Sequence, residues 1–453
     1  MACHAAIIAF KIIMNTYEPV IGMEIHVELK TKSGMFCGCP ADHFGKTPNT
    51  GTCPVCLGLP GALPIPNKKA IEWTIMLGLA LGSEIAEFSK FDRKHYFYPD
   101  LPKGYQISQY DQPLCTGGKI STSFGDVRIH RVHLEEDTGK LQHATIDGKR
   151  VTLVDFNRSG VPLVEIVTEP DIHSSEQAKE FLKKLHQIVR YLGISDADME
   201  KGSMRLEPNI SIRKVGEKGL PDYKVEVKNI NSFRFAAQAI DFEVARHQVI
   251  LESGKVPVQE TRGWDEGKNG TVSQRVKEEA ADYRYFPEPD IPPLRFTKEQ
   301  IAQIAKTIPE LPEVKFARFL NEYALTPADA GILTEHRSLS EFYEEAVRVL
   351  RETKEQLTPK DLANWLINKK VDIEKELPAS VVESLVIAKK VVAMSDEDIY
   401  KVIDAVLAEN PKAVTDFRAG KEPVIMFLMG QCRSKLPKVD TAIIIKLLRG
   451  RLS

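Results

Sequence analysis

Three polar residues near the start of the chain, Glu24, His26 and Glu28, could perform chemistry because two carboxylates flank one imidazole at a spacing of two. The residues between them are apolar, and strict alternation predicts a strand with one face in a core. Side chains on one face of a strand start about 6–7 Å apart, so neighbours can lean together and share a cation. The solvated face of an antiparallel sheet would give the same pattern.

Two further strand-like segments carry carboxylates. One ends in Glu135 and Glu136 and also contains His133. In the other, Glu165 lies alone in the apolar run from Val161 to Val167. A buried carboxylate is costly unless a charge or a metal ion satisfies it. Carboxylates from three strands, together with a histidine, form the oxygen-rich type of site that holds hard cations such as Mg²⁺.

Four of the seven cysteines are close in the sequence, as the pairs Cys37/Cys39 and Cys53/Cys56. The residues between the pairs are rich in Pro, Gly and Asn, which are typical of loops. Two close pairs on loops are typical of a tetrahedral zinc site, although the CxC spacing is less usual than CxxC. Four thiolates close the coordination shell, so we expect structural zinc in the loop 37–56. Four free thiols are the alternative.

The segment from Phe91 to Gln106 is rich in aromatic and cationic residues, among them Lys94, Tyr98 and Lys103. Such interleaving can stack on a nucleotide or on the end of a tRNA. It is equally consistent with a packed, hydrogen-bonded loop. The composition alone does not choose between these interpretations.

Periodicity predicts the elements that must position these residues. Residues 70–81 and 174–192 are expected to be helices, and the second has capping-box spacing at its start and an apolar stripe. Sheet-like alternation returns at residues 224–235, and a helix then continues to about Glu252. The sequence therefore places helices between the segments that carry the polar residues.

The length of the chain predicts about three domains. The order of strand and helix signals predicts an α+β fold. After a short N-terminal extension, 1–16, residues 17–293 mix strands and helices. The proline-rich stretch 287–293 marks the end of this part. Residues 294–378 and 379–453 are Glu/Lys-rich with almost no strand signals, so we expect a helical domain and a helical tail.

The net charge of −2 excludes a globally basic protein, so any nucleic-acid surface must be local. The tail has a local basic excess that favours a phosphate-facing surface, although a solvated charged face is the alternative. No apolar run approaches the ~20 residues of a membrane helix, and no basic leader precedes the first apolar run. We therefore expect a cytoplasmic protein without a signal peptide or membrane anchor, in which Met14 could be the true start.

The chain resembles the GatB family, one of the component chains of the tRNA-dependent amidotransferases, from about Tyr17 to its C-terminus. Enzymes of this kind convert misacylated Glu-tRNA(Gln) or Asp-tRNA(Asn) to the correct Gln or Asn form. The resemblance rests on many specific stretches of sequence: Ile21–Leu29, Cys53–Ala62, Phe91–Asp111, His133–Lys140, Val161–Asp171, Val227–Phe235, Gln259–Glu266 and Asp282–Pro289.

The resemblance implies a cradle-like N-terminal domain with a mixed or antiparallel sheet, then a helical domain and a tRNA-binding helical tail. It implies that ATP phosphorylates the side-chain carboxylate on the tRNA and that ammonia then displaces the phosphate. An amidase-type glutaminase partner would make the ammonia from glutamine, and a small third partner would complete a heterotrimer. The chain itself has no P-loop and no serine-rich amidase signature.

The resemblance also assigns roles to residues. It places Mg²⁺ at Glu24, His26, Glu135, Glu136 and Glu165, although His26 could instead orient a carboxylate or ammonia. Structural Zn²⁺ is expected at Cys37, Cys39, Cys53 and Cys56. Contacts to ATP phosphate or the acceptor end are expected from Lys94, Tyr98, Lys103 and Arg234. Contacts from the tail to tRNA are expected from Lys421, Arg433, Lys435 and Lys438.

Some features depart from the family pattern. The segment after Gln431 is shortened, the helical domain is compact, and Glu207-Pro208 replaces the more usual Asp-Ala. Two other functions compete with the one implied. A non-catalytic zinc-containing tRNA-binding protein would not need Glu165 in an apolar strand. A metallohydrolase with the same acidic residues would turn over without ATP.

Overall fold

The computed structural model describes residues 16–276, 283–353, 355–390, 396–436, 439 and 441–452, and the structural statements below concern these residues. The chain divides into two compact units, one that extends to Pro312 and one that starts at Glu313. Apart from Thr16, the predicted N-terminal extension lies outside the described residues, as do Asp282 and Lys438.

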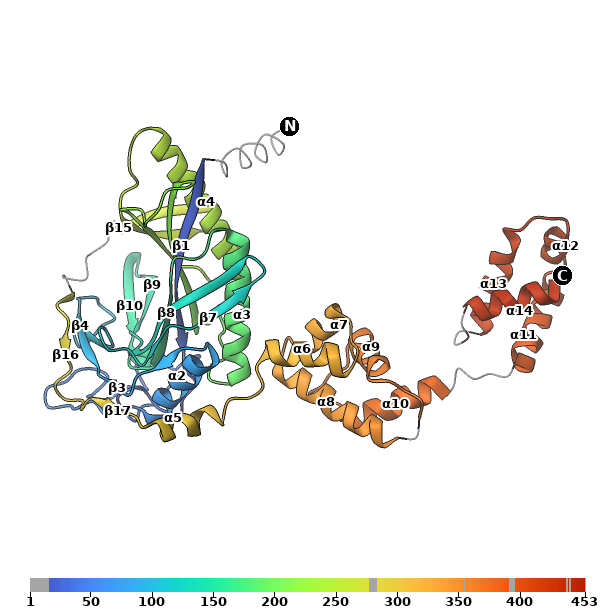
Figure 1. Ribbon diagram of the computed structural model, residues 1–453, viewed down its shortest axis with the longest axis horizontal. Helices are drawn as coiled ribbons and strands as arrows, with labels where there is room; N and C mark the ends of the chain where they lie inside the picture. The colour runs from blue at the N-terminus through green and yellow to red at the C-terminus, as the bar shows by residue number, and fades with distance from the viewer. Residues whose placement is uncertain are drawn as a thin grey trace. The chain divides into compact units, whose positions relative to one another are not determined.

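A 10-stranded sheet organises the first unit (Figure 1). The strands of this unit, in chain order, are β1 (Tyr17–Glu28), β2 (Glu84–Ile85), β3 (Phe88–Ser89), β4 (Asp92–His95), β5 (Tyr105–Ser108), β6 (Cys115–Thr116), β7 (Lys119–Thr122), β8 (Gly125–Glu136), β9 (Lys140–Ile146), β10 (Lys149–Asp155), β11 (Pro162–Thr168), β12 (Met204–Lys214), β13 (Val225–Lys228), β14 (Glu260–Asp265), β15 (Gly270–Val276), β16 (Phe286–Pro287) and β17 (Leu294–Arg295). The large sheet has the order β15-β14-β13-β12-β1-β11-β8-β6-β2, with β7 paired to β8. The remaining strands form small sheets of two or three strands.

Strand β1 lies inside this sheet and confirms the predicted alternation. Ile21, Met23 and Ile25 are at most 1% exposed because they face the core, whereas Glu24 and His26 project from the other face and are less buried. Both neighbours of β1 are antiparallel, β11 on one side and β12 on the other. The polar face of β1 is therefore bordered by side chains from two other strands.

Three helices cover the apolar face: α2 (Lys68–Ala80), α3 (Ser175–Leu192) and α4 (Phe233–Glu252). Helices α3 and α4 pack side by side (Figure 1). Phe181 and Leu185 of α3 are fully buried in the same core as the apolar residues of β1. The Ser174 side chain caps α3 by accepting a hydrogen bond from the Gln177 N–H, and Gly193 ends the helix at φ +68°. The prediction of a helix at 174–192 is confirmed.

Helix α5 (Lys298–Ala305) contacts α2, so residues beyond the proline-rich stretch still pack on the first unit. The second unit contains α6 (Pro312–Glu322), α7 (Pro327–Leu333), α8 (Arg337–Glu352), α9 (Pro359–Lys369), α10 (Pro378–Lys390), α11 (Asp396–Glu409), α12 (Pro411–Arg418), α13 (Val424–Lys435) and α14 (Thr441–Leu452). These helices build two separate hydrophobic cores, one from Phe319 to Leu385 and one from Ile399 to Leu452. Helix α10 belongs to the first core, and the second core starts in α11.

The predicted α+β class is confirmed, with a mixed sheet and helices in the first unit and described helices in the second. The sheet is antiparallel except where β13 pairs with β14 in parallel. The division into residues 17–293, 294–378 and 379–453 stays a proposal about domain boundaries. Within the described residues, none of the helices combines the length and apolarity that crossing a bilayer requires.

Candidate functional site

Three side chains from three strands converge on the polar face of the large sheet: His26 of β1, Glu165 of β11 and Glu135 of β8. The register places His26 opposite Glu165, and Glu165 opposite His133 of β8. The Nε2 atom of His26 lies 3.5 Å from a Glu135 oxygen and 3.6 Å from a Glu165 oxygen. We call these three residues the histidine–carboxylate group.

Burial and charge make this group unusual. Glu135 and Glu165 are 2% and 7% exposed. Burial alone would raise the pKa of Glu165, but the charge and hydrogen bond of His133, with those of His26, hold it well below its ordinary value. Burial alone would lower the pKa of His26, but the Glu165 hydrogen bond and the charges of Glu207, Glu165 and Glu135 raise it to about 9. The imidazolium therefore balances the buried carboxylates.

The same atoms fit a divalent cation. One ligand atom from each residue of the group lies within 4.8 Å of the others. Octahedral ligands at 2.0–2.1 Å from Mg²⁺ are roughly 3 Å apart, close to the 3.5 Å and 3.6 Å separations here. The Nε2 atom of His133 lies 3.1 Å from the same Glu165 oxygen that faces His26, so it is placed to orient that carboxylate. A cation would replace the proton on His26 as the balancing positive charge.

A second acidic group lies beside the first, and Glu24 belongs to it. Glu24 pairs in register with Glu207 of β12, and these two with Glu226 of β13 also bring ligand atoms within 4.8 Å of one another. The Nζ atom of Lys228 lies 2.7 Å from Glu207 and 3.4 Å from Glu226, which neutralises part of this charge. The Nδ1 atom of His26 is 3.8 Å from Glu207, so one polar row connects both groups.

Glu207, Glu226 and Lys228 are not among the site residues predicted from the sequence. The only sequence signal for Glu207 was the local departure at Glu207-Pro208. In the structure the Glu207 carboxylate lies opposite Glu24 in register and 3.8 Å from the Nδ1 atom of His26.

Glu136 does not join either group. It follows Glu135 directly, so the pleat sends it to the other face of β8. There its carboxylate pairs with Lys103 and accepts a hydrogen bond of 2.9 Å from the Ile107 N–H. Lys103 is thereby occupied by an internal ion pair. The third carboxylate of β1, Glu28, contacts His43 of the cysteine loop at 3.0 Å.

The other residues predicted to contact phosphate lie in different surroundings. Tyr98 is 51% exposed. Arg234 is exposed in the first turn of α4, with its guanidinium 4.8 Å from the Phe235 ring centroid. Lys94 of β4 is partly buried between tyrosine rings and close enough to feel the charges of Glu135 and Glu165. Of these residues, Lys94 is the one whose pKa is raised by the charges of Glu135 and Glu165.

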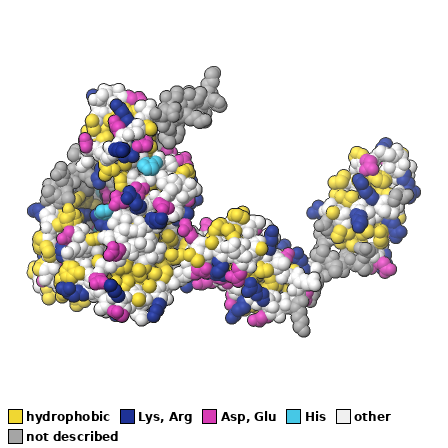
Figure 2. All heavy atoms as spheres, in the orientation of Figure 1, with side chains coloured by type: hydrophobic (Ala, Val, Ile, Leu, Met, Phe, Trp, Pro, Cys, Tyr) yellow, Lys and Arg dark blue, Asp and Glu magenta, His cyan; other side chains and the backbone are white. Residues whose placement is uncertain are grey.

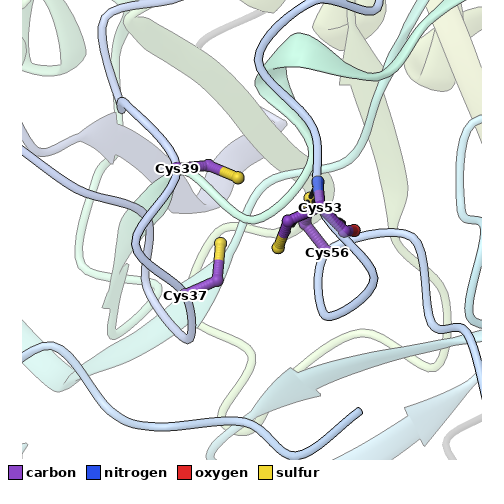
Figure 3. A group of neighbouring side chains, drawn as sticks. All are labelled: Cys37, Cys39, Cys53 and Cys56. Atoms are coloured by element: carbon purple, nitrogen blue, oxygen red, sulfur yellow. Dashed lines mark hydrogen bonds between the residues drawn. The ribbon is translucent and has the colours of Figure 1, made fainter.

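The four predicted cysteines come together from two loops, Cys37 and Cys39 from one and Cys53 and Cys56 from the other (Figure 3). Their sulfur atoms all lie within 4.8 Å of one another, and those of Cys53 and Cys56 are 3.9 Å apart. Ligands at 2.3 Å from a tetrahedral zinc ion are about 3.8 Å apart. The cluster can therefore bind a metal ion.

The thiols of this cluster compete for their protons. The hydrogen bond with Cys37 is the main cause that lowers the pKa of Cys56 to about 5. Burial, with the contact to Cys53, raises the pKa of Cys39 to about 12. The Cys56 sulfur thus carries negative charge that hydrogen bonds from neighbouring thiols stabilise. A metal ion bound by four thiolates would stabilise this charge in the same place.

The basic residues of the tail lie on α13 and its flanks. Lys421 pairs with Asp416 at 3.0 Å and Lys435 with Glu409 at 2.6 Å. These pairs are exposed, and exposed pairs are weak enough for a phosphate to compete with them. Arg433 is exposed in the last turn of α13, and Lys438 lies outside the described residues. Figure 2 shows Lys and Arg side chains spread over this part of the surface.

Comparison with known proteins finds similar domains and similar full-length chains. A model of the GatB/GatE catalytic domain matches residues 19–302, and a model of the GatB domain matches residues 375–452. The B subunit of the aspartyl/glutamyl-tRNA(Asn/Gln) amidotransferase of Thermomicrobium roseum is 45% identical over 96% of this chain and 99% of its own length. The proteins of that name from Thermosipho melanesiensis and Dehalococcoides mccartyi are 46% and 47% identical, each over 92% of this chain.

Proposed function

Because the chain belongs to the GatB family, we propose that it is the component of a tRNA-dependent amidotransferase that converts the acid on a misacylated tRNA to its amide. The substrates would be Glu-tRNA(Gln), Asp-tRNA(Asn) or both. The observation that supports this proposal best is the histidine–carboxylate group of His26, Glu135 and Glu165 on the polar face of the sheet.

The reaction has two steps with balanced charges. A side-chain carboxylate oxygen attacks the γ-phosphorus of ATP, the bond to the β-phosphate oxygen breaks, and ADP leaves. Ammonia then attacks the acyl carbon, the carbon–oxygen bond to phosphate breaks, and hydrogen phosphate leaves with one ammonia proton. The first step is needed because oxide is a poor leaving group, and phosphoryl transfer depends chiefly on positioning and charge neutralisation.

The residues of the site fit these needs. His26, Glu135 and Glu165 would hold Mg²⁺, which neutralises phosphate charge when bound. His133 would keep Glu165 in its ligating orientation. Glu24, Glu207 and Glu226 form a negative surface next to this position, where His26 is placed to orient the second reactant. Glu136, which pairs with Lys103, would support the loop rather than the ion.

The relatives are named as one component of an amidotransferase, which implies a multi-subunit enzyme. We propose that an amidase-type glutaminase partner supplies ammonia and that a small third partner completes a heterotrimer. Co-purification with these partners, followed by amidation assays with both misacylated tRNAs, tests the function. Product that forms only with ATP supports it, whereas turnover without ATP indicates a hydrolase and binding without turnover indicates a scaffold.

We expect the Cys53→Ser variant to melt at least about 5 °C below the wild type, because it removes one of four ligands from a structural Zn²⁺. Metal analysis should find one zinc per chain in the wild type and less in the variant. Cys115→Ser, at a buried cysteine outside the cluster, is the matched control and should keep its zinc. Carefully purified wild-type protein without zinc would refute the proposal for this site.

We expect truncation after Lys390 to weaken tRNA binding and to flatten its dependence on salt, because fewer phosphates would be neutralised. The cut leaves the core from Phe319 to Leu385 intact and removes the core that starts in α11. The slope of log affinity against log salt measures the effect. An unchanged slope would show that the tail makes no ionic contact with tRNA.

A further inference from the structure

The histidine–carboxylate group lies close to one end of the strands that carry it. The register places Glu28, Leu163 and Glu135 in one row across β1, β11 and β8. His26 and Glu165 lie opposite each other, two residues further from that end. Strands β1 and β8 end here, and β11 begins here. Backbone pairs at strand ends open more easily than pairs inside a sheet, so the spacing of the group depends on what closes this end.

Backbone hydrogen bonds continue past the last pairs of these strands. The Asp137 N–H donates to the Val161 carbonyl at 2.8 Å, and the Gly160 N–H donates back to the Asp137 carbonyl at 2.9 Å. These two bonds join the end of β8 to the start of β11. The Leu29 N–H donates to the Pro162 carbonyl at 2.9 Å and joins the end of β1 to the same place. The start of β11 therefore connects all three strands.

The cysteine loop, residues 37–56, lies directly against the start of β11. The Ser159 hydroxyl donates a hydrogen bond to the Cys56 carbonyl at 3.2 Å. Gly160 has φ +83°, and a β-carbon added there would lie 3.4 Å from the Cβ atom of Cys56, so this close approach favours glycine. The Met35 N–H, two residues before the first cysteine pair, donates to the Gly160 carbonyl at 2.6 Å. Segments next to both cysteine pairs therefore hold this part of the backbone.

A second contact of the cysteine loop reaches the polar face of β1. The Nε2 atom of His43 lies 3.0 Å from a Glu28 oxygen, and both side chains are largely buried. Glu28 lies two residues after His26 on the same face of the strand, and it shares its row with Glu135. His43 therefore connects the loop to β1, as Ser159 connects it to β11.

We propose that His43 and Ser159 are positioning residues, through which the cysteine loop holds the strand ends and thereby the ligand spacing of the histidine–carboxylate group. A metal ion on the four cysteines then strengthens the binding of the divalent cation at the other site. This inference rests on the proposed function and adds the control of its cation affinity. The separations of 3.5 Å and 3.6 Å around His26 suit a small ion, and they depend on strands whose ends the loop fastens.

The test measures Mn²⁺ binding to the complex with its partner proteins by electron paramagnetic resonance, at a temperature where circular dichroism shows each variant to be folded. The signal of the site is the binding that Glu165→Gln removes. In the His43→Ala and Ser159→Ala variants, the Kd of that site should rise by about tenfold, as when a supporting side chain around a metal is lost. Both variants should retain their zinc. His43→Gln should recover most of the affinity, because its amide keeps a donor for Glu28.

Removal of zinc from the wild-type complex with a chelator, which is then washed out, should raise the same Kd by about 10- to 100-fold. Added Zn²⁺ should restore it. The KM for Mg²⁺ in ADP formation should rise in parallel, while kcat at saturating Mg²⁺ stays within about twofold of the wild type.

Two control variants remove similar contacts elsewhere in the first unit. His130→Ala is the matched control for His43→Ala, because it removes a histidine–glutamate pair of 2.9 Å, with Glu169. Ser83→Ala is the matched control for Ser159→Ala, because the Ser83 hydroxyl also donates to a backbone carbonyl distant in sequence, at 2.7 Å. Both controls should bind Mn²⁺ as the wild type does.

A loop that only stabilised the fold would give a different result. The folded variants and the zinc-free complex would then bind Mn²⁺ with a Kd within about twofold of the wild type, and only their melting temperatures would fall. That result would overturn the inference, as would a lower kcat with an unchanged KM for Mg²⁺. A wild-type complex without a Mn²⁺ site that Glu165→Gln removes would instead contradict the proposed function itself.

Discussion

The Glu165→Gln variant is expected to lose phosphorylation of the acylated tRNA by at least about 10³-fold while its tRNA affinity stays within about twofold. The substitution keeps the shape of the side chain but removes the negative charge. Glu165 is 7% exposed and lies 3.6 Å from His26 and 3.1 Å from His133, so water cannot replace that charge. Single-turnover ADP formation and a tRNA binding titration measure the two quantities.

Glu169→Gln is the matched control, because Glu169 follows the same strand, β11, but is partly exposed and pairs with His130. It should retain wild-type activity. Equal losses of tRNA binding and phosphorylation in Glu165→Gln would favour a non-catalytic scaffold. Full activity of that variant would remove Glu165 from the catalytic site altogether.

The Glu243→Gln variant is expected to be less stable than the wild type by about 3 kcal/mol at pH 7, with a melting temperature lower by roughly 6–12 °C. Glu243 of α4 is fully buried and contacts His247 at 3.0 Å and Arg262 of β14 at 3.1 Å, and it also accepts a hydrogen bond from Thr271 of β15. This cluster fastens α4 to β14 and β15, and β14 pairs with β13, which carries Glu226 and Lys228.

The pH dependence of this effect has a defined sign. Burial would raise the pKa of Glu243, but hydrogen bonds from His247, Arg246 and Thr271 lower it from 4.5 to about 2. Because the pKa of Glu243 is lower in the folded protein than in the unfolded chain, its carboxylate stabilises the fold fully above pH 4.5. This stabilisation is lost as the pH falls towards 2. Urea unfolding at pH 7 and pH 4 should therefore show a smaller difference between variant and wild type at the lower pH.

Glu87→Gln, at a mostly exposed carboxylate, is the matched control and should change stability by less than about 0.5 kcal/mol at either pH. A Glu243→Gln variant as stable as the wild type at pH 7 would show that the buried cluster contributes nothing to the fold. A difference that grows at lower pH would contradict the direction assigned to the Glu243 pKa.

Local patterns predicted the parts of the fold that depend on neighbouring residues. The alternation of β1, the cap and apolar stripe of α3 and the pairing of the cysteines each follow from residues a few positions apart. The lone Glu165 in an apolar run also pointed to the site. In each case one short segment carries the physical reason, so no knowledge of distant contacts was needed.

The composition of the site depended on strand register, which the sequence does not reveal. Glu24 and His26 share a face of β1, yet the register puts Glu165 opposite His26 and Glu207 opposite Glu24. Two residues along β1, from Glu24 to His26, therefore separate the two acidic groups. Adjacent residues face opposite ways in a strand, which is why Glu136 meets Lys103 rather than the ion site.

The central claim is that His26, Glu135 and Glu165 hold one divalent cation for phosphoryl transfer. Crystals of the complex grown with Mn²⁺ and a non-hydrolysable ATP analogue test it through the anomalous signal of manganese. The account predicts a peak bonded to all three side chains and to phosphate oxygens of the analogue. A fully occupied manganese ion elsewhere on the analogue's phosphates, with these three side chains unligated, would contradict it.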